Sequence, residues 1–195
     1  MFAFLAILNS GGIDRAGVEA RVSRAASRAF PWAKDMETTR WTSPSGKLAL
    51  WTWSNEKPGV TGSIEADASS AVVRLGYQGG TKCRVIDDRL TCSTTLARQE
   101  PIYYAEGRRE IIVASRALPI AFLLAPEGRP AFDLLAFAAC FSNGYNAGGF
   151  LTPRTPFAGV NLAPPNAELV ASPRGIAVTD PGNLYRDFGF GTEKP

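Results

Sequence analysis

The feature that most constrains the fold is a long succession of short β-type runs. Between residues 39 and 115 the chain is rich in β-branched and aromatic residues, with turn residues such as Ser43-Pro-Ser-Gly46 and Asp87-Asp88 between the runs. Runs so close together favour antiparallel pairing, because parallel strands need crossover connections of a dozen or more residues. The predicted strands are residues 39–41, 47–53, 71–77, 82–86, 90–95, 101–105 and 110–115.

Helical patterns lie outside this region. Residues 2–8 predict a buried strand, and a helix is predicted from Asp14, which can cap its start, to about Phe30, since Pro31 follows. Segregated helices and strands predict an α+β domain. We predict a single domain over residues 1–180, and a C-terminal linker or tail over residues 181–195. The other predicted elements are helices over 116–124 and 132–141 and a hairpin of 167–171 with 176–179.

A possible nucleotide motif stands between the first strand and the first helix. Ser10-Gly-Gly-Ile-Asp14 has the arrangement of a pyrophosphate-binding loop in enzymes that adenylate a carboxylate. That loop belongs to a parallel sheet whose strands alternate with helices, and this chain does not alternate. A serine also follows the aspartate in such a loop, whereas Arg15 follows here. We therefore interpret the motif as a strand end and a helix cap, and we predict no ATP binding.

Composition excludes several functions. The chain contains no histidine, so it cannot form a Ser-His-Asp or Cys-His relay, and Cys83, Cys92 and Cys140 have no C-x-x-C spacing. The net charge is only +3 and the basic residues are scattered, which argues against nucleic-acid binding. No apolar stretch is long enough to cross a membrane. We expect a cytoplasmic protein with no cofactor and no metal site, although Asp87-Asp88 leaves a metal site open as an alternative to a hairpin turn.

Several segments resemble one known family in order and spacing. Pro101-Ile-Tyr-Tyr-Ala105 and Ile111-Ile-Val-Ala-Ser-Arg-Ala-Leu118 are similar to "PLYYA" and "FASELKAL", and Thr155-Pro-Phe-Ala-Gly-Val160 and Leu162-Ala-Pro-Pro-Asn166 to "RTLFRGV" and "LPPGH". These are motifs of the N-terminal glutamine-amidotransferase domain of asparagine synthetases, β-lactam synthetases and lasso-peptide cyclases. The opening residues 1–22 also resemble that domain's first strand, turn and helix. Residues 132–137 and 141–145 look like its "LAEYLSFGY" segment.

The resemblance implies an N-terminal-nucleophile fold, an αββα sandwich of two antiparallel sheets between helical layers. In that family a cysteine becomes the first residue after methionine removal, and its α-amino group acts as the base. This chain has Phe2 at that place, and phenylalanine cannot act as a nucleophile.

Other parts of the family's active site are also replaced. Its "RGPD" corresponds to residues 30–34, and its "HRRL", whose arginine holds the glutamine carboxylate, corresponds to Leu50-Trp-Thr-Trp53. Tryptophan offers one weak donor where arginine forms two charge-assisted hydrogen bonds. The oxyanion-hole segment has no clear counterpart, although residues 75–80 stand near its place, and residues 96–100 replace "RDRxG". We expect no glutaminase activity.

Trp51 and Trp53 alternate along one strand, so they share a face. We interpret Phe2, Trp51 and Trp53 as the filling of a vestigial substrate pocket. The resemblance implies a catalytically inactive amidotransferase-like domain that serves an ATP-dependent amide-forming synthetase, as a covalent domain or a separate subunit. The alternatives are a stand-alone binding module that uses the former glutamine cleft and, less favoured, an active hydrolase with an unconventional nucleophile.

Overall fold

The computed structural model describes most of the chain and resolves it into two stacked sheets. The described residues are 1–30, 35–56, 62–76, 80–95, 100–107, 109–125, 128–142 and 154–179. The predicted boundary at residue 180 and the predicted tail 181–195 lie outside them. The α+β class and the antiparallel pairing predicted from the sequence are both confirmed, because every strand pair in the described part of the chain is antiparallel.

The described strands form two sheets of six strands each, which we call sheet A and sheet B. Sheet A runs in the order β10 (Asn161–Leu162), β8 (Tyr103–Glu106), β9 (Glu110–Ala114), β1 (Phe2–Asn9), β3 (Leu48–Ser54), β2 (Glu37–Thr42). Sheet B runs in the order β12 (Gly175–Thr179), β11 (Glu168–Ser172), β7 (Arg89–Ser93), β6 (Lys82–Ile86), β5 (Ser70–Leu75), β4 (Gly62–Ala66).

The first strand lies inside sheet A, between β9 and β3, and is buried on both faces. Phe2, Phe4, Ala6 and Leu8 face sheet B, and the alternate residues 3, 5 and 7 face the helices. This double burial explains why the strand is an uninterrupted apolar run instead of an alternating one.

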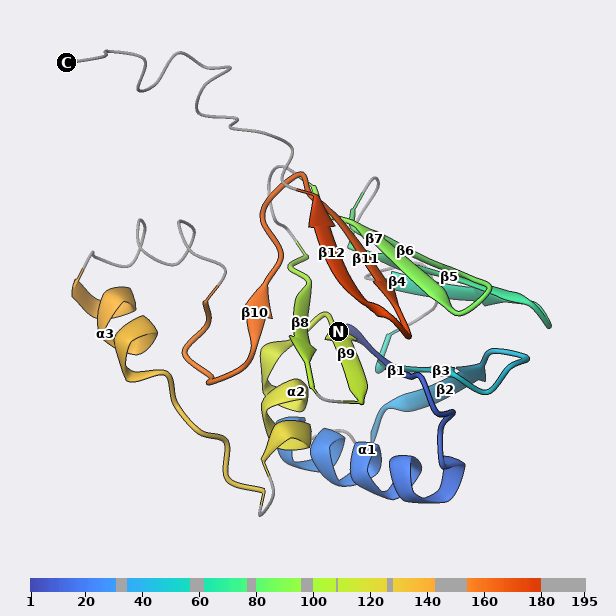
Figure 1. Ribbon diagram of the computed structural model, residues 1–195, viewed down its shortest axis with the longest axis horizontal. Helices are drawn as coiled ribbons and strands as arrows, with labels where there is room; N and C mark the ends of the chain where they lie inside the picture. The colour runs from blue at the N-terminus through green and yellow to red at the C-terminus, as the bar shows by residue number, and fades with distance from the viewer. Residues whose placement is uncertain are drawn as a thin grey trace, which may run out of the picture.

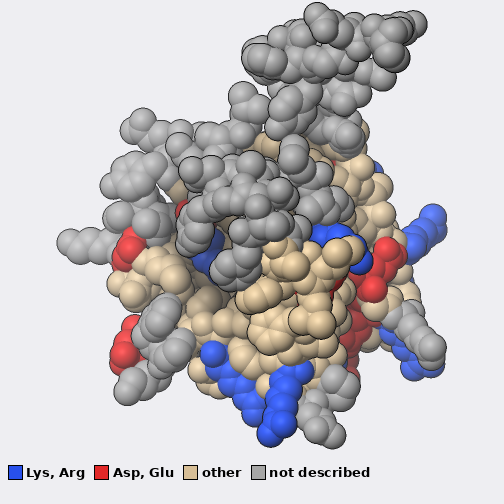
Figure 2. All heavy atoms as spheres, turned by 90° about the vertical axis from the view of Figure 1, so that its left-hand side faces the viewer, with Lys and Arg blue, Asp and Glu red and all other residues tan. Residues whose placement is uncertain are grey.

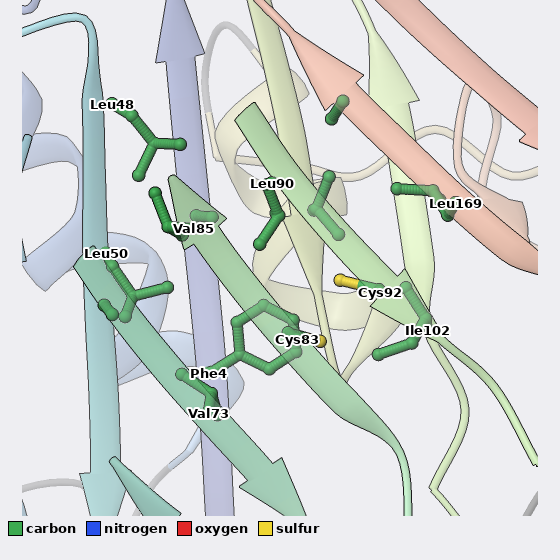
Figure 3. Packing of buried hydrophobic residues seen from close by; sticks show 14 of the residues in the cluster. Phe4, Leu48, Leu50, Val73, Cys83, Val85, Leu90, Cys92, Ile102 and Leu169 are labelled. Atoms are coloured by element: carbon green, nitrogen blue, oxygen red, sulfur yellow. The ribbon is translucent and has the colours of Figure 1, made fainter. Parts of the chain in front are cut away.

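Sheets A and B pack face to face through the larger apolar cluster. Phe4 and Leu50 of sheet A, with Ile102 just before β8, contact side chains of sheet B in this cluster. Their partners from sheet B include Val73, Cys83 and Leu90. Figure 3 shows these side chains directed toward one another between the strands. Each large apolar side chain removed from water contributes about 1.5–3 kcal/mol. This cluster is therefore the main core of the protein.

Helices α1 (Arg15–Ala29) and α2 (Ala117–Leu124) cover the other face of sheet A. Val18 and Val22 of α1 and Ile120 of α2 are buried there against Leu5 and Ile112. Figure 1 shows both helices on the side of sheet A away from sheet B. The third helix, α3 (Leu134–Ser142), stands to one side of the sheets.

The expected second helical layer is where the structure departs from the αββα sandwich. None of the helices in the described ranges lies over the outer face of sheet B, so the described part of the chain has the layers α, β and β. An antiparallel sheet tolerates this arrangement because one of its faces can be polar. None of the helices in the described ranges is long and apolar enough to cross a membrane.

Candidate functional site

The position at which the resemblance predicts a nucleophile lies at the start of β1 and is apolar. Phe2 is 6% exposed, and its ring faces sheet B. A Cβ atom added at Gly62 of β4 would lie 2.4 Å from a ring carbon of Phe2, so the ring fills the space above the glycine. The phenyl ring therefore acts as a packing group between the two sheets.

The two tryptophans lie on the opposite face of sheet A. Trp51 and Trp53 are 3% and 5% exposed and pack in the cluster beneath α1, which confirms that they share a face. In the β1–β3 register Phe2 pairs with Ser54, whereas Ala3 pairs with Trp53. Since successive residues of a strand point to opposite faces, the structure does not bring Phe2 and the tryptophans together in one pocket.

A groove lies over the tryptophans, between α1 and β2. Its volume is about 340 Å³, and Ser23, Thr38 and Glu19 contribute polar groups to its walls. Arg40 forms an ion pair with Glu19, and its guanidinium lies 5.7 Å from the centre of the Trp51 ring. The arginine at the groove is thus already paired with a carboxylate of the chain, and the floor beneath it is aromatic.

The α-amino group of Met1 also has partners within the chain. It donates a hydrogen bond of 2.6 Å to Asn55 Oδ1 and pairs with the Glu56 carboxylate. Both acceptors follow the end of β3 directly.

The Ser10-Gly-Gly-Ile-Asp14 segment is a closed turn. The N–H groups of Gly11 and Gly12 donate to the side-chain and backbone oxygens of Asn9, and the N–H of Ile13 donates to Gly46 O, all within 2.9–3.1 Å. A phosphate-binding loop needs such groups to be free for the ligand. The interpretation as a strand end is confirmed, and Asp14 occupies the N-cap position of α1 without a side-chain capping bond.

Asp87 and Asp88 form the two-residue turn of the β6–β7 hairpin. Both have positive φ, at 46° and 59°, as a type I′ turn requires. Asp88 Oδ2 accepts a hydrogen bond of 2.5 Å from Ser45. The hairpin turn is therefore the interpretation that the backbone geometry supports. No group of three or more cysteine and acidic side chains placed to hold a metal ion is found among the described residues.

Three of the segments that the resemblance compares with active-site motifs are only partly described. Residues 31–34, 77–79 and 96–99 lie outside the described ranges. Phe30 packs against Trp53, with ring centres 5.9 Å apart. Glu100 forms an ion pair of 3.1 Å with Arg116, and its carbonyl accepts a hydrogen bond from Thr81 Oγ1. The described residues at the ends of these segments therefore pack in the core or form hydrogen bonds and ion pairs within the chain.

Two surfaces were not identified from the sequence. On α3 and beside it, Phe132, Leu134, Leu135 and Phe137 are 42–76% exposed. Figure 2 shows the side of the molecule on which α3 lies, with an area of uncharged residues below the grey atoms. On sheet B, a groove of about 570 Å³ is lined by Lys82, Arg84 and Arg89 among other residues. The alternation of Lys82-Cys83-Arg84-Val85 was the sequence signal for this second surface, because it puts both cations on one face.

Comparison with known proteins adds no assignment. No protein-family model matches the chain, and no curated protein matches it either.

Proposed function

We propose that this chain is a catalytically inactive glutamine-amidotransferase-like domain of the N-terminal-nucleophile type. Its role is structural: it binds an ATP-dependent amide-forming synthetase in the cytoplasm, as a covalent domain or a separate subunit. The motifs quoted above carry the family assignment. The pair of stacked antiparallel sheets, with β1 inside sheet A, agrees with it.

One observation carries the inactivity. Phe2 stands where the nucleophile would be, and its ring is buried against Gly62 between the sheets. The segment Leu50-Trp-Thr-Trp53, which the resemblance compares with "HRRL", contains no arginine that could hold the glutamine carboxylate. A synthetase that uses an amine of its own substrate needs no ammonia, so the glutaminase chemistry can disappear while the docking role is kept.

The inactivity is tested with purified protein and glutamine. We expect no ammonia release and no reaction with a glutamine-analogue electrophile. We expect the Phe2→Cys variant to stay inactive, because residues 50–53 contain no arginine to hold the glutamine carboxylate. Stoichiometric labelling of a cysteine in the wild-type protein would overturn the proposal.

The docking role is tested with the reading frame that follows this one. A frame with a Ser-Gly-Gly-x-Asp-Ser loop, whose product co-purifies with this chain, supports the synthetase partnership. Absence of such a frame favours the second candidate, a stand-alone binding module. The groove over Trp51 and Trp53 is the observation that favours this candidate, because aromatic and hydroxyl groups line it.

A further inference from the structure

The outer face of sheet B carries a concentration of positive charge. Arg74 of β5, Lys82 and Arg84 of β6 and Arg89 of β7 all alternate with inward-facing core residues, so they project to the same outer side. Three of these cations line the groove of about 570 Å³, together with a single acidic residue, Asp87. The charges that appear scattered in the sequence are therefore brought together by the strand register.

Three of these four cations lack a balancing carboxylate among the described residues. Arg74 and Lys82 are directly opposite each other in the β5–β6 register, an arrangement of like charges that destabilises a sheet. Arg74 reaches Glu65 at 3.5 Å, but within the part of the chain that the structure describes Lys82, Arg84 and Arg89 form no ion pair. An anion from outside the chain that approaches this face would relieve the repulsion.

The size of the positive area indicates what kind of anion fits. It spans β5 to β7, which is about 10 Å because neighbouring strands are about 4.8 Å apart. Its length is that of a five-residue strand, about 17 Å. One α-helix is about 10–12 Å wide and rises 5.4 Å per turn, so about three helical turns cover the area.

The borders of the area favour a short acidic segment over a long polyanion. Glu65 lies on the β4 side, and Glu168 of β11 is paired with Ser93 on the other side, so a nucleic acid that extends across the sheet meets carboxylates at both borders. Exposed Ile86, and Val72 and Val170, which are partly buried, supply apolar contacts that a phosphate backbone does not use. An amphipathic acidic helix satisfies both the charge and the apolar groups.

We infer that the outer face of sheet B is a docking surface for an acidic, amphipathic helix of a protein partner. Such a helix would add the helical layer over sheet B that no described residue supplies. The inference rests on the proposed function, in that the partner is the synthetase, and it names the face that the synthetase contacts.

Charge reversal tests the inference with the full chain and the synthetase from the downstream reading frame. We expect R84E/R89E to bind the synthetase at least tenfold more weakly than the wild type, as measured by calorimetry. The control, R15E/R24E, makes the same charge change on α1, and we expect less than a twofold effect. Circular dichroism and urea unfolding check that both variants fold.

A carbodiimide, which joins amines to carboxylates, gives an independent measurement. We expect mass spectrometry to find Lys82 cross-linked to an acidic residue of the synthetase. If the wild type binds the synthetase, but R84E/R89E binds equally well and Lys82 is not cross-linked, the docking face is wrong while the proposed function stands. If the wild type does not bind the synthetase, both fall.

The nucleic-acid alternative is an arm of the same experiment. Oligouridylate of 20 nucleotides is titrated into the wild type and into R84E/R89E. We expect no binding to either protein at physiological salt. Oligouridylate binding that the wild type shows and R84E/R89E loses would overturn the acidic-helix inference and assign the face to nucleic acid.

Discussion

At the scale of single residues, Asp67 shows how one side chain holds a turn. Its carboxylate accepts hydrogen bonds from the backbone N–H groups of Ser69 and Ser70, each at 2.7 Å, and from the hydroxyl groups of both serines. These bonds lower the pKa of Asp67 to about 2, and the bond from the Ser69 N–H makes the largest contribution. Asp67 lies between β4 and β5, so these bonds stabilise the turn that joins the two strands.

We expect Asp67→Asn to destabilise the protein at neutral pH, because the amide keeps only one acceptor oxygen. The pKa is lowered in the folded state, so the carboxylate stabilises the fold above the unfolded-state pKa near 3.8 and loses this effect as the pH falls through about 2. Urea unfolding from pH 7 to pH 2 measures the difference between the two proteins. It should be largest at pH 7 and shrink between pH 4 and pH 2.

Glu37→Gln is the matched control, since Glu37 is exposed at the start of β2 and the substitution removes the same charge. It should leave the urea midpoint unchanged over this range. An Asp67→Asn protein as stable as the wild type at pH 7 would show that the hydrogen bonds do not hold the turn.

At the scale of elements, contact between β1 and β4 joins the two sheets at one end. Gly62 begins β4, and the ring of Phe2 occupies the space where a side chain would stand. The carbonyl of Arg74 lies close to the same space. A glycine is therefore required at this position by packing, and not by its backbone angles.

We expect Gly62→Ala to cost about 1–3 kcal/mol in the free energy of unfolding, as overpacked sites do. Phe2→Ala should cost about 3–5 kcal/mol, because it leaves a cavity between the sheets. The double variant should lose less than the sum, since removal of the ring makes room for the new methyl group. Urea unfolding of the four proteins measures the coupling.

Gly11→Ala serves as the control, because a Cβ atom there meets only Asn9 Oδ1 at an ordinary 3.5 Å. Its free energy of unfolding should change by less than about 0.5 kcal/mol. Strict additivity of the two substitutions would contradict the contact between Phe2 and Gly62.

Most elements were predictable because their signals are local. The strand at 82–86 agrees with β6, and the helix predicted from Asp14 agrees with α1 to within a residue at each end. The strands β4 and β10 were missed. Gly62-Ser-Ile-Glu-Ala66 has only one large apolar residue and Asn161–Leu162 is two residues long, so both exist through pairing with neighbouring strands.

At the scale of the whole molecule, the two sheets enclose a pair of thiols. Cys83 and Cys92 are opposite each other in the β6–β7 register, and both are at most 1% exposed. Figure 3 shows them within the core between the sheets. The pKa of the Cys83 thiol is raised well above its usual value, mainly because the thiol is buried. The neighbouring Cys92 raises this pKa further. Neither thiol forms a disulfide.

We expect both thiols to react with a thiol reagent only when the sheets separate. Cys140→Ser removes the third cysteine, whose side chain lies outside the described ones. In this variant the labelling rate in native buffer should equal the rate in high urea multiplied by the equilibrium fraction of open molecules, provided that reclosing is faster than labelling. Both thiols should react at once in high urea. Rapid labelling of the native protein would contradict the closed core.

The local pattern of the chain determined the α+β class, the buried first strand, the hairpin at Asp87-Asp88 and the shared face of Trp51 and Trp53. Each of these depends on residues that are neighbours in the sequence. Only the tertiary structure decided that Phe2 faces away from the tryptophans, because the side of a strand that meets another sheet is set by distant elements. It also decided that Lys82, Arg84 and Arg89 form one positive face, since strand register brings together charges that the sequence leaves apart.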